Sequence, residues 1–160
     1  MKKRLLALVM AVAMVACFAA VSFAADAKIA LKVGDVVDGK VKVQAIATDA
    51  AALKSADWVL VYDEALTLTT PANAAVTNPA NGTGDLAQIG TDTVALAAMG
   101  GNLMTAYNAE VAGEVQIGFA FKEALGTDAE TILFTAEFAV AEGAENVEIK
   151  LTNKDGSAVD

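Results

Sequence analysis

The sequence predicts an all-β protein, an antiparallel β-sandwich of jelly-roll type that is preceded by a signal-peptide helix. Three observations support this prediction: many short segments alternate apolar with polar residues, turns rich in Gly and Asn separate them, and no long amphipathic helical pattern occurs. Alternation places one face of a strand in a core and the other toward solvent. Each segment therefore indicates which of its side chains form the core.

The first 24 residues have the layout of a secretory signal peptide. Three positive charges within residues 2–4 precede an apolar run over residues 5–21, and Ser22-Phe23-Ala24 forms a small-x-small cleavage site. We therefore expect cleavage after Ala24, which leaves residues 25–160 as one secreted, extracellular domain.

Two alternatives concern the same N-terminal segment. The first is a retained membrane anchor, because the apolar run approaches the length that spans a bilayer. The second is a cell-surface lipoprotein, because Met14-Val15-Ala16-Cys17 resembles a bacterial lipobox in which the cysteine is lipidated. Unless Cys17 is lipidated, we expect no membrane contact after cleavage.

Composition excludes several classes of function for residues 25–160. Eight lysines, no arginine and twenty carboxylates give a net charge of −12, which argues against binding of nucleic acid or anionic lipid. The sequence has no His, so it lacks the residue required for His-based acid–base catalysis, Ser-His-Asp triads and the usual zinc sites. Cys17 is the sole cysteine, so cleavage leaves no thiol nucleophile and no disulfide.

We also expect no enzymatic activity, no cofactor and no metal site. A glycosidase needs two carboxylates across a sugar-binding cleft, and no residue pattern indicates such a pair. Asn153-x-Asp155-Gly156 has part of a calcium-loop pattern, but Leu151 stands at the first ligand position, so a polar turn is the expected structure.

The N-terminal half of the domain contains four expected strands. Residues 28–33, 40–47 and 66–69 alternate, and an Ala-rich connection follows the second of them. The strand at residues 55–63 has the clearest faces: one carries Trp58, Leu60 and Tyr62, the other Asp57, Val59, Val61 and Asp63. The aromatic face is expected in the core. The second face either lies under a loop or is an outer face that meets another protein.

The middle of the sequence is less regular. Residues 71–92 read as a long loop with its strongest turn at Asn81-Gly82 and a short strand near Leu86–Ile89. Residues 93–99 suit either a strand or one helical turn, and the Gly100-Gly101-Asn102 sequence ends them.

Four further strands are expected after this point. They cover residues 103–111 around Tyr107, 115–121, 131–140 and 147–151. In the second, Val115, Ile117, Phe119 and Phe121 share the core face, and the opposite face carries small residues that suit close approach of another backbone. In the third, the expected core face carries Ile132, Phe134, Ala136, Phe138 and Val140, with Leu133 opposite.

The run Ser55-Ala56-Asp57-Trp58-Val59-Leu60-Val61-Tyr62-Asp63 resembles the third strand of cohesin modules. Cohesins are β-sandwich receptors on bacterial scaffoldins that bind dockerin modules of polysaccharide-degrading enzymes. The similarity continues in the Tyr62-Asp63-x-x-Leu66 run and in the strand order over residues 29–156, and it is strongest over residues 55–68 and 115–140. The resemblance implies a jelly-roll sandwich that binds a dockerin-bearing protein.

The resemblance also implies which residues bind the partner. Asp57 matches the cohesin Asp that accepts hydrogen bonds from dockerin, and Ser55 stands where Asn is common. Val59 and Val61 share their face, Tyr107 matches an aromatic on a neighbouring strand of that face, and an acidic residue after the Phe-rich strand falls at Lys122 or Glu123. Lys122 reverses the charge at that position. For each of these residues the alternative is an ordinary solvated or packed side chain.

The expected function is therefore a secreted, non-catalytic module that docks dockerin-bearing proteins in extracellular polysaccharide-degrading assemblies. The alternatives are a carbohydrate-binding module of the related sandwich fold, with polysaccharide as its ligand, and a secreted structural or adhesion subunit. In cohesins a further strand usually follows the turn that matches residues 153–156 and pairs near the first strand. Only residues 157–160 follow here, so the strand at 28–33 is expected to have an open edge.

Overall fold

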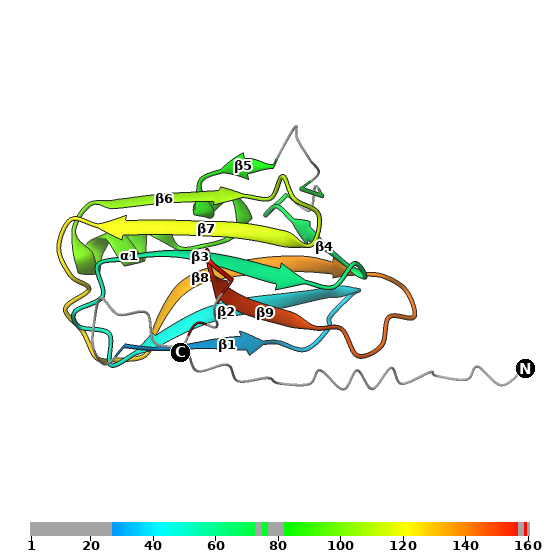
Figure 1. Cartoon of the computed structure of the whole chain (residues 1–160), viewed down its shortest axis with the longest axis horizontal. Helices are drawn as coiled ribbons and strands as arrows, with labels where there is room; N and C mark the ends of the chain where they lie inside the picture. Colours follow the sequence, from blue (N-terminus) through cyan, green and yellow to red (C-terminus); the bar gives the residue numbers. More distant parts are fainter. Residues whose placement is uncertain (1–26, 73–74, 77–81, 157–158, 160) are drawn as a thin grey trace, which may run out of the picture.

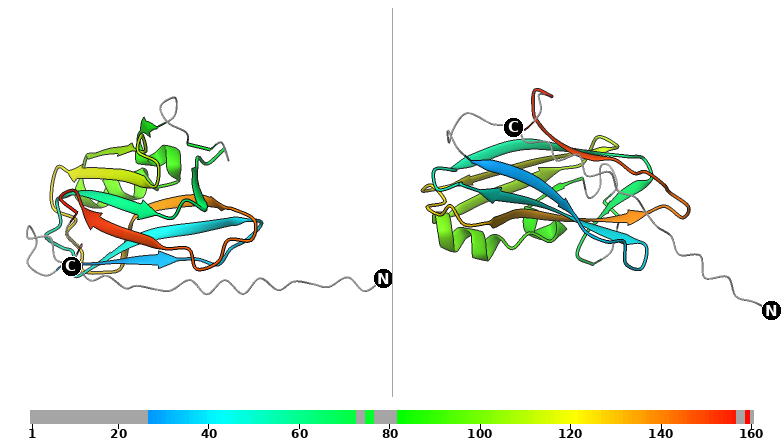
Figure 2. Two further views of the ribbon diagram at one scale, coloured as in Figure 1. Left: turned by 45° about the vertical axis from the view of Figure 1, so that its right-hand side comes forward. Right: turned by 90° about the horizontal axis from the view of Figure 1, so that it is seen from below.

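The computed structural model describes residues 27–72, 75–76, 82–156 and 159. The expected signal peptide, its cleavage site after Ala24 and the lipobox cysteine Cys17 lie outside the described residues, as does Asn81 of the expected turn. Two β-sheets lie one over the other and bury a single core between them (Figures 1 and 2). The predicted all-β antiparallel sandwich is confirmed.

Every pair of neighbouring strands in the two sheets is antiparallel. The four-stranded sheet has the order β1 (Lys28–Val33), β2 (Lys40–Thr48), β8 (Thr131–Val140) and β4 (Leu66–Thr69). The five-stranded sheet has the order β5 (Thr83–Gly84), β6 (Leu103–Asn108), β7 (Glu114–Phe121), β3 (Ser55–Tyr62) and β9 (Ile149–Asn153). β3 therefore lies between β7 and β9, and its two faces belong to the core and to the outside of the sandwich.

Aromatic and branched side chains from both sheets fill the core. Trp58 and Leu60 of β3 point inward as predicted, and the Trp58 and Phe119 rings form a T-shaped contact at a centroid distance of 5.4 Å. Phe134 and Phe138 of β8 approach from the opposite sheet and are fully buried. The predicted core face of β7 is confirmed for all four of its members, Val115, Ile117, Phe119 and Phe121.

The prediction for the start of β8 is wrong, because a β-bulge interrupts the alternation. The register with β2 pairs Ala45 with Phe134 but Ile46 with Ile132, so Leu133 is an extra residue in β8. An extra residue reverses the face of everything on one side of it. Leu133 is consequently fully buried, whereas Ile132, which was expected in the core, is 45% exposed.

The segment expected to hold a short strand forms a 3₁₀ helix, η1 (Leu86–Ile89). Asp85 caps it: its carboxylate accepts from the Ala87 backbone N–H, while the Gln88 side chain accepts from the Asp85 N–H. Gly90, at φ 113°, ends the helix in a conformation that favours glycine. The Asp85 carboxylate thus satisfies an N–H at the start of the helix, and the Gly90 N–H donates to the Leu86 and Ala87 carbonyls at its end.

The ambiguous segment that follows is a helix, α1 (Thr93–Gly100), which lies beside β6 at one end of the sandwich (Figure 1). The Asp92 carboxylate accepts from the Ala95 N–H at 2.9 Å and starts the helix. At its other end, Gly100 packs so closely on the Phe121 ring that a Cβ there would lie 2.4 Å from a ring carbon. Among the described residues, no helix is long and apolar enough to cross a membrane.

The strand bounds that differ most from the prediction are those of β6 and β9. β6 stops at Asn108 rather than residue 111, because the Asn108 side chain accepts from the Glu110 N–H and turns the chain. β9 covers Ile149–Asn153 rather than residues 147–151. Within the described part of the chain, β1 has a strand neighbour on one side only, as expected from the sequence. Val159 is buried in the core near the end of the chain.

Candidate functional site

The outward side chains of the five-stranded sheet form a surface that we call the β3–β7 face. Because Trp58 and Leu60 point inward, the alternate residues of β3 point outward, and the registers extend this surface to the adjacent strands. Its members are Ser55, Asp57, Val59 and Val61 of β3, Glu114, Gln116, Gly118 and Ala120 of β7, Met104, Ala106 and Asn108 of β6, and Lys150 and Thr152 of β9.

Asp57 lies at a part of this face where its neighbours are small. It is opposite Gly118 of β7, and Gly118 is in turn opposite Ala106 of β6. The next outward cross-strand pair also contains a small residue, because Ser55 is opposite Ala120. Asp57, Ser55 and Ala106 are exposed. Gly118, Ala106 and Ala120 thus form a shallow area beside the Asp57 carboxylate, which we call the floor, where a partner's backbone can approach closely.

A lysine that directly follows the adjacent edge strand, β9, reaches this carboxylate. The β3–β9 register pairs Asn153 with Trp58, so the next residue, Lys154, comes opposite Asp57. The Lys154 Nζ lies 3.2 Å from the Asp57 Oδ2, and both side chains remain more than half exposed. Such a solvated pair is typically worth about 0.2–1 kcal/mol, so it holds the carboxylate only weakly.

The two valines of the β3–β7 face differ in what they offer a partner. Val59 is only 8% exposed between Gln116 and Thr152, and its carbonyl accepts from the Thr152 hydroxyl at 3.3 Å. Val61 is 36% exposed. Of the two, Val61 provides accessible apolar surface, whereas Val59 mainly supports its neighbours.

The expectation that Tyr107 shares this face is wrong. Tyr107 pairs with Ile117, whose side chain is in the core, so the ring points inward and is 4% exposed. Burial raises the pKa of its phenol above the usual value. The outward residue that sequence reasoning missed is Met104, which is 74% exposed beside Ala120. Its position follows from alternation once Tyr107 is placed in the core.

Lys122 and Glu123 directly follow β7 at the end of the sheet that also holds Ser55. The Lys122 N–H donates to the Asn102 carbonyl and the Glu123 N–H to the Gly100 carbonyl, at 3.0 and 2.9 Å. Both side chains are exposed. The structure thus brings Ser55, Asp57, Lys122 and Glu123 to one half of the five-stranded sheet. Among the expected residues Tyr107 alone points into the core, while Val59 points outward but is covered by its neighbours.

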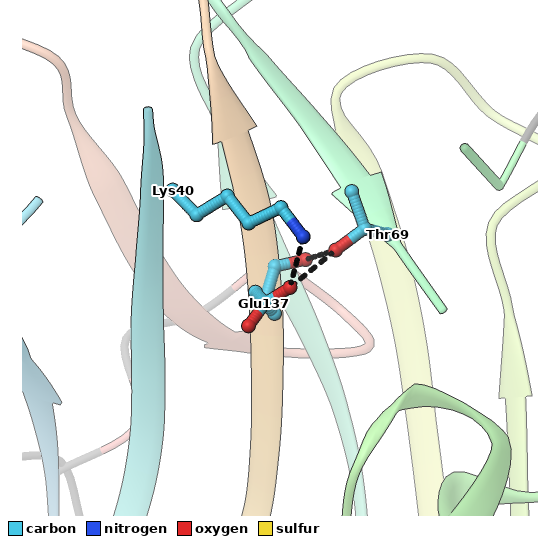
Figure 3. A network of polar contacts seen from close by, with 3 residues as sticks. All are labelled: Lys40, Thr69 and Glu137. Carbon is cyan, nitrogen blue, oxygen red and sulfur yellow. Dashed lines mark hydrogen bonds and ion pairs between the residues drawn. The ribbon is translucent and has the colours of Figure 1, made fainter. Parts of the chain in front are cut away.

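The outer face of the other sheet carries a polar network that has a structural role (Figure 3). Lys40 Nζ of β2 lies 3.1 Å from Glu137 Oε1 of β8, and the Thr69 hydroxyl of β4 donates to the Glu137 carbonyl at 3.0 Å. The three side chains join three adjacent strands and satisfy one another. Across residues 27–72, 75–76, 82–156 and 159, no group of three or more His, Cys, Asp or Glu residues is placed to hold a metal ion.

Among the residues that the structure describes, almost no aromatic side chain lies on the surface. Trp58, Tyr107 and the phenylalanines of β7 and β8 are all buried, and Tyr62 is half-buried against the Phe138 ring. Sugar-binding surfaces commonly present exposed rings for stacking. The described part of the chain has no fully exposed aromatic ring that could serve in this way.

The architecture is similar to that of solved cohesin modules. The second type II cohesin module of the ScaA scaffoldin of Acetivibrio cellulolyticus matches with a TM-score of 0.52 and 10% identity, over 79% of this chain and 69% of that one. A type II Cohesin-X-Dockerin complex from the same organism matches with the same score and identity, over 79% and 76%. No protein-family model and no curated protein sequence matches the chain. These similarities establish a cohesin-like fold.

Proposed function

We propose that this protein is a secreted, non-catalytic module that docks dockerin-bearing proteins through its β3–β7 face. The observation that carries the proposal is Asp57, an exposed carboxylate on the outside of a cohesin-like sandwich, opposite a glycine. A neighbour of the same fold was solved as a Cohesin-X-Dockerin complex, which supports dockerin as the class of partner. The proposed secretion depends on the signal-peptide pattern of residues 1–24.

The chemistry of the β3–β7 face suits a protein partner. Asp57 supplies a charged hydrogen-bond acceptor, and Gly118, Ala106 and Ala120 beside it leave the surface low. Met104 adds an exposed apolar side chain to the same surface. A flexible methionine beside small residues can adapt to the shape of a partner's side chains. The exposed carboxylate can fix the orientation of the partner through a hydrogen bond.

Carbohydrate binding is the second candidate because related sandwiches bind polysaccharides. The buried positions of Trp58 and Tyr107 argue against it, since neither ring is available for stacking on a sugar. A structural or adhesion role is the third candidate, and it predicts neither dockerin binding nor polysaccharide binding.

Calorimetry and affinity electrophoresis separate these candidates. The protein is titrated with recombinant dockerin modules encoded by the producing organism and is run through gels that contain cellulose derivatives or other polysaccharides. The proposal predicts saturable binding of at least one dockerin and unchanged mobility in every gel. Retardation by a polysaccharide, with no dockerin bound, would establish the carbohydrate-binding alternative instead.

A further inference from the structure

In the ion pair between Lys154 and Asp57, a cation of the protein itself occupies the carboxylate to which a partner's hydrogen-bond donor would bind. In the described part of the chain, Lys154 is the hydrogen-bonding partner of the Asp57 side chain. It reaches Asp57 from a turn in which the Gly156 N–H donates to the Asn153 carbonyl at 2.9 Å. Lys154 therefore stands beside the β3–β7 face without being part of a strand.

We infer that Lys154 competes with the partner for the Asp57 carboxylate, and that the group which displaces it is a cationic side chain of the dockerin. This inference rests on the proposed docking function and specifies the partner's chemistry at one point. Three features of the chain carry it: the position of Lys154, the small residues around Asp57 and the overall charge.

The position of the lysine permits displacement. Both members of the pair are more than half exposed, so Lys154 can move into water without leaving a buried charge behind. The floor beside Asp57 consists of Gly118, Ala106 and Ala120, which offer the carboxylate no side-chain donor. A partner that covers this floor removes water from Asp57 and has to supply the donor that the floor lacks.

The overall charge favours a cation as that donor. Residues 25–160 carry a net charge of −12, which attracts a positively charged partner at long range. Lys154 opposes such a partner locally, both by occupying Asp57 and by repulsion. Its removal is therefore expected to strengthen binding rather than weaken it.

The test compares Lys154→Gln with Lys54→Gln, each of which removes one positive charge. Lys54 is exposed and directly precedes β3, near the same face, and it forms no ion pair with any residue that the structure describes. The probe is the dockerin that binds most tightly in the calorimetric titration. Lys154→Gln is expected to tighten binding about two- to fivefold, the range that corresponds to an exposed ion pair, and Lys54→Gln less than that.

The same comparison in an Asp57→Asn background isolates the competition. There the gain in affinity from Lys154→Gln is expected to fall to the smaller gain seen with Lys54→Gln, because the carboxylate for which the two cations compete is gone and only the repulsion between cations remains. An equal gain in both backgrounds, or no gain in the parent protein, would overturn the competition. Failure of the parent protein to bind any dockerin would overturn the proposed function and this inference with it.

Discussion

Asp57 lies directly opposite Gly118 across the β3–β7 ladder, so an exposed carboxylate stands beside a strand position without a side chain. Gly118 does not adopt a positive φ, and its position in the strand does not require glycine for conformation. A Cβ added there would have the Ala56 carbonyl oxygen as its nearest neighbour, at 4.0 Å. The fold can accept a larger residue at Gly118, whereas a partner that lies on this floor cannot.

Gly118→Val tests this distinction. Valine favours strands, so the free energy of unfolding is expected to stay equal or rise slightly. The branched side chain fills space beside Asp57 that a partner would occupy. Dockerin affinity is therefore expected to fall by about tenfold or more, because of steric overpacking at the centre of the interface. Calorimetric titration and a thermal melt measure the two effects. Undiminished affinity in a folded variant would show that the partner does not cover Gly118.

Asp57→Ala tests the carboxylate itself. Loss of a charged hydrogen-bond partner is expected to weaken dockerin binding by about 1–3 kcal/mol. The free energy of unfolding should change by no more than about 0.5 kcal/mol, because Asp57 is exposed and only weakly paired. Glu142→Ala, in the exposed turn after β8, removes the same charge away from this face and serves as control. A sharp drop in melting temperature with unchanged affinity would assign Asp57 a structural role.

The bulge in β8 gives a matched pair of variants for stability. Leu133→Ala removes a fully buried side chain and is expected to lower the free energy of unfolding by about 2–5 kcal/mol. Ile132→Ala, one residue away, removes a half-exposed side chain and is expected to cost about 1 kcal/mol or less. Urea denaturation of both variants decides the point. The reverse order of stabilities would restore the face assignment that simple alternation predicts.

The alternation of apolar and polar residues predicted most of the strands and of the core, because a strand in a sandwich has one face toward solvent and one toward the core. All four inward residues of β7 follow this pattern. The alternation gave the wrong face for Leu133, because a bulge adds one residue to the strand there and nothing in the local sequence marks its position. The η1 helix carried a readable signal, the Asp85–Gln88 capping box, that competed with a weak strand pattern.

The candidate site could be predicted only in part. Asp57 follows from alternation around Trp58, and the structure places it on the outer face. The family resemblance predicts Tyr107 on that face. In β6, however, Tyr107 lies on the same side of the strand as Leu103 and Thr105, which is the inward side. The Lys154 contact depends on the register between β3 and β9, which are far apart in sequence, and no local pattern specifies that register.

The open edge of β1 predicts a specific pattern of hydrogen exchange. The Gly34 N–H donates to the Lys42 carbonyl, so alternate amides of β1, those of Ala30 and Lys32, point toward β2. The amides of Ile29, Leu31 and Val33 then point away from the sheet. We expect them to exchange at least about tenfold faster than those of Ala30 and Lys32 in the monomer. Equal, strong protection of both sets would mean that another segment already pairs with this edge.

Amide chemical-shift mapping locates the surface on which a dockerin binds, and so shows whether that surface is the β3–β7 face. The isotope-labelled protein is titrated with the unlabelled dockerin that binds it. We expect the largest shifts to cluster at Asp57, Ala106, Gly118 and Ala120, which lie side by side on β3, β6 and β7. Shifts that cluster instead on β1, β2 and β8 of the opposite sheet would contradict this expectation, and so would a titration in which no shift changes.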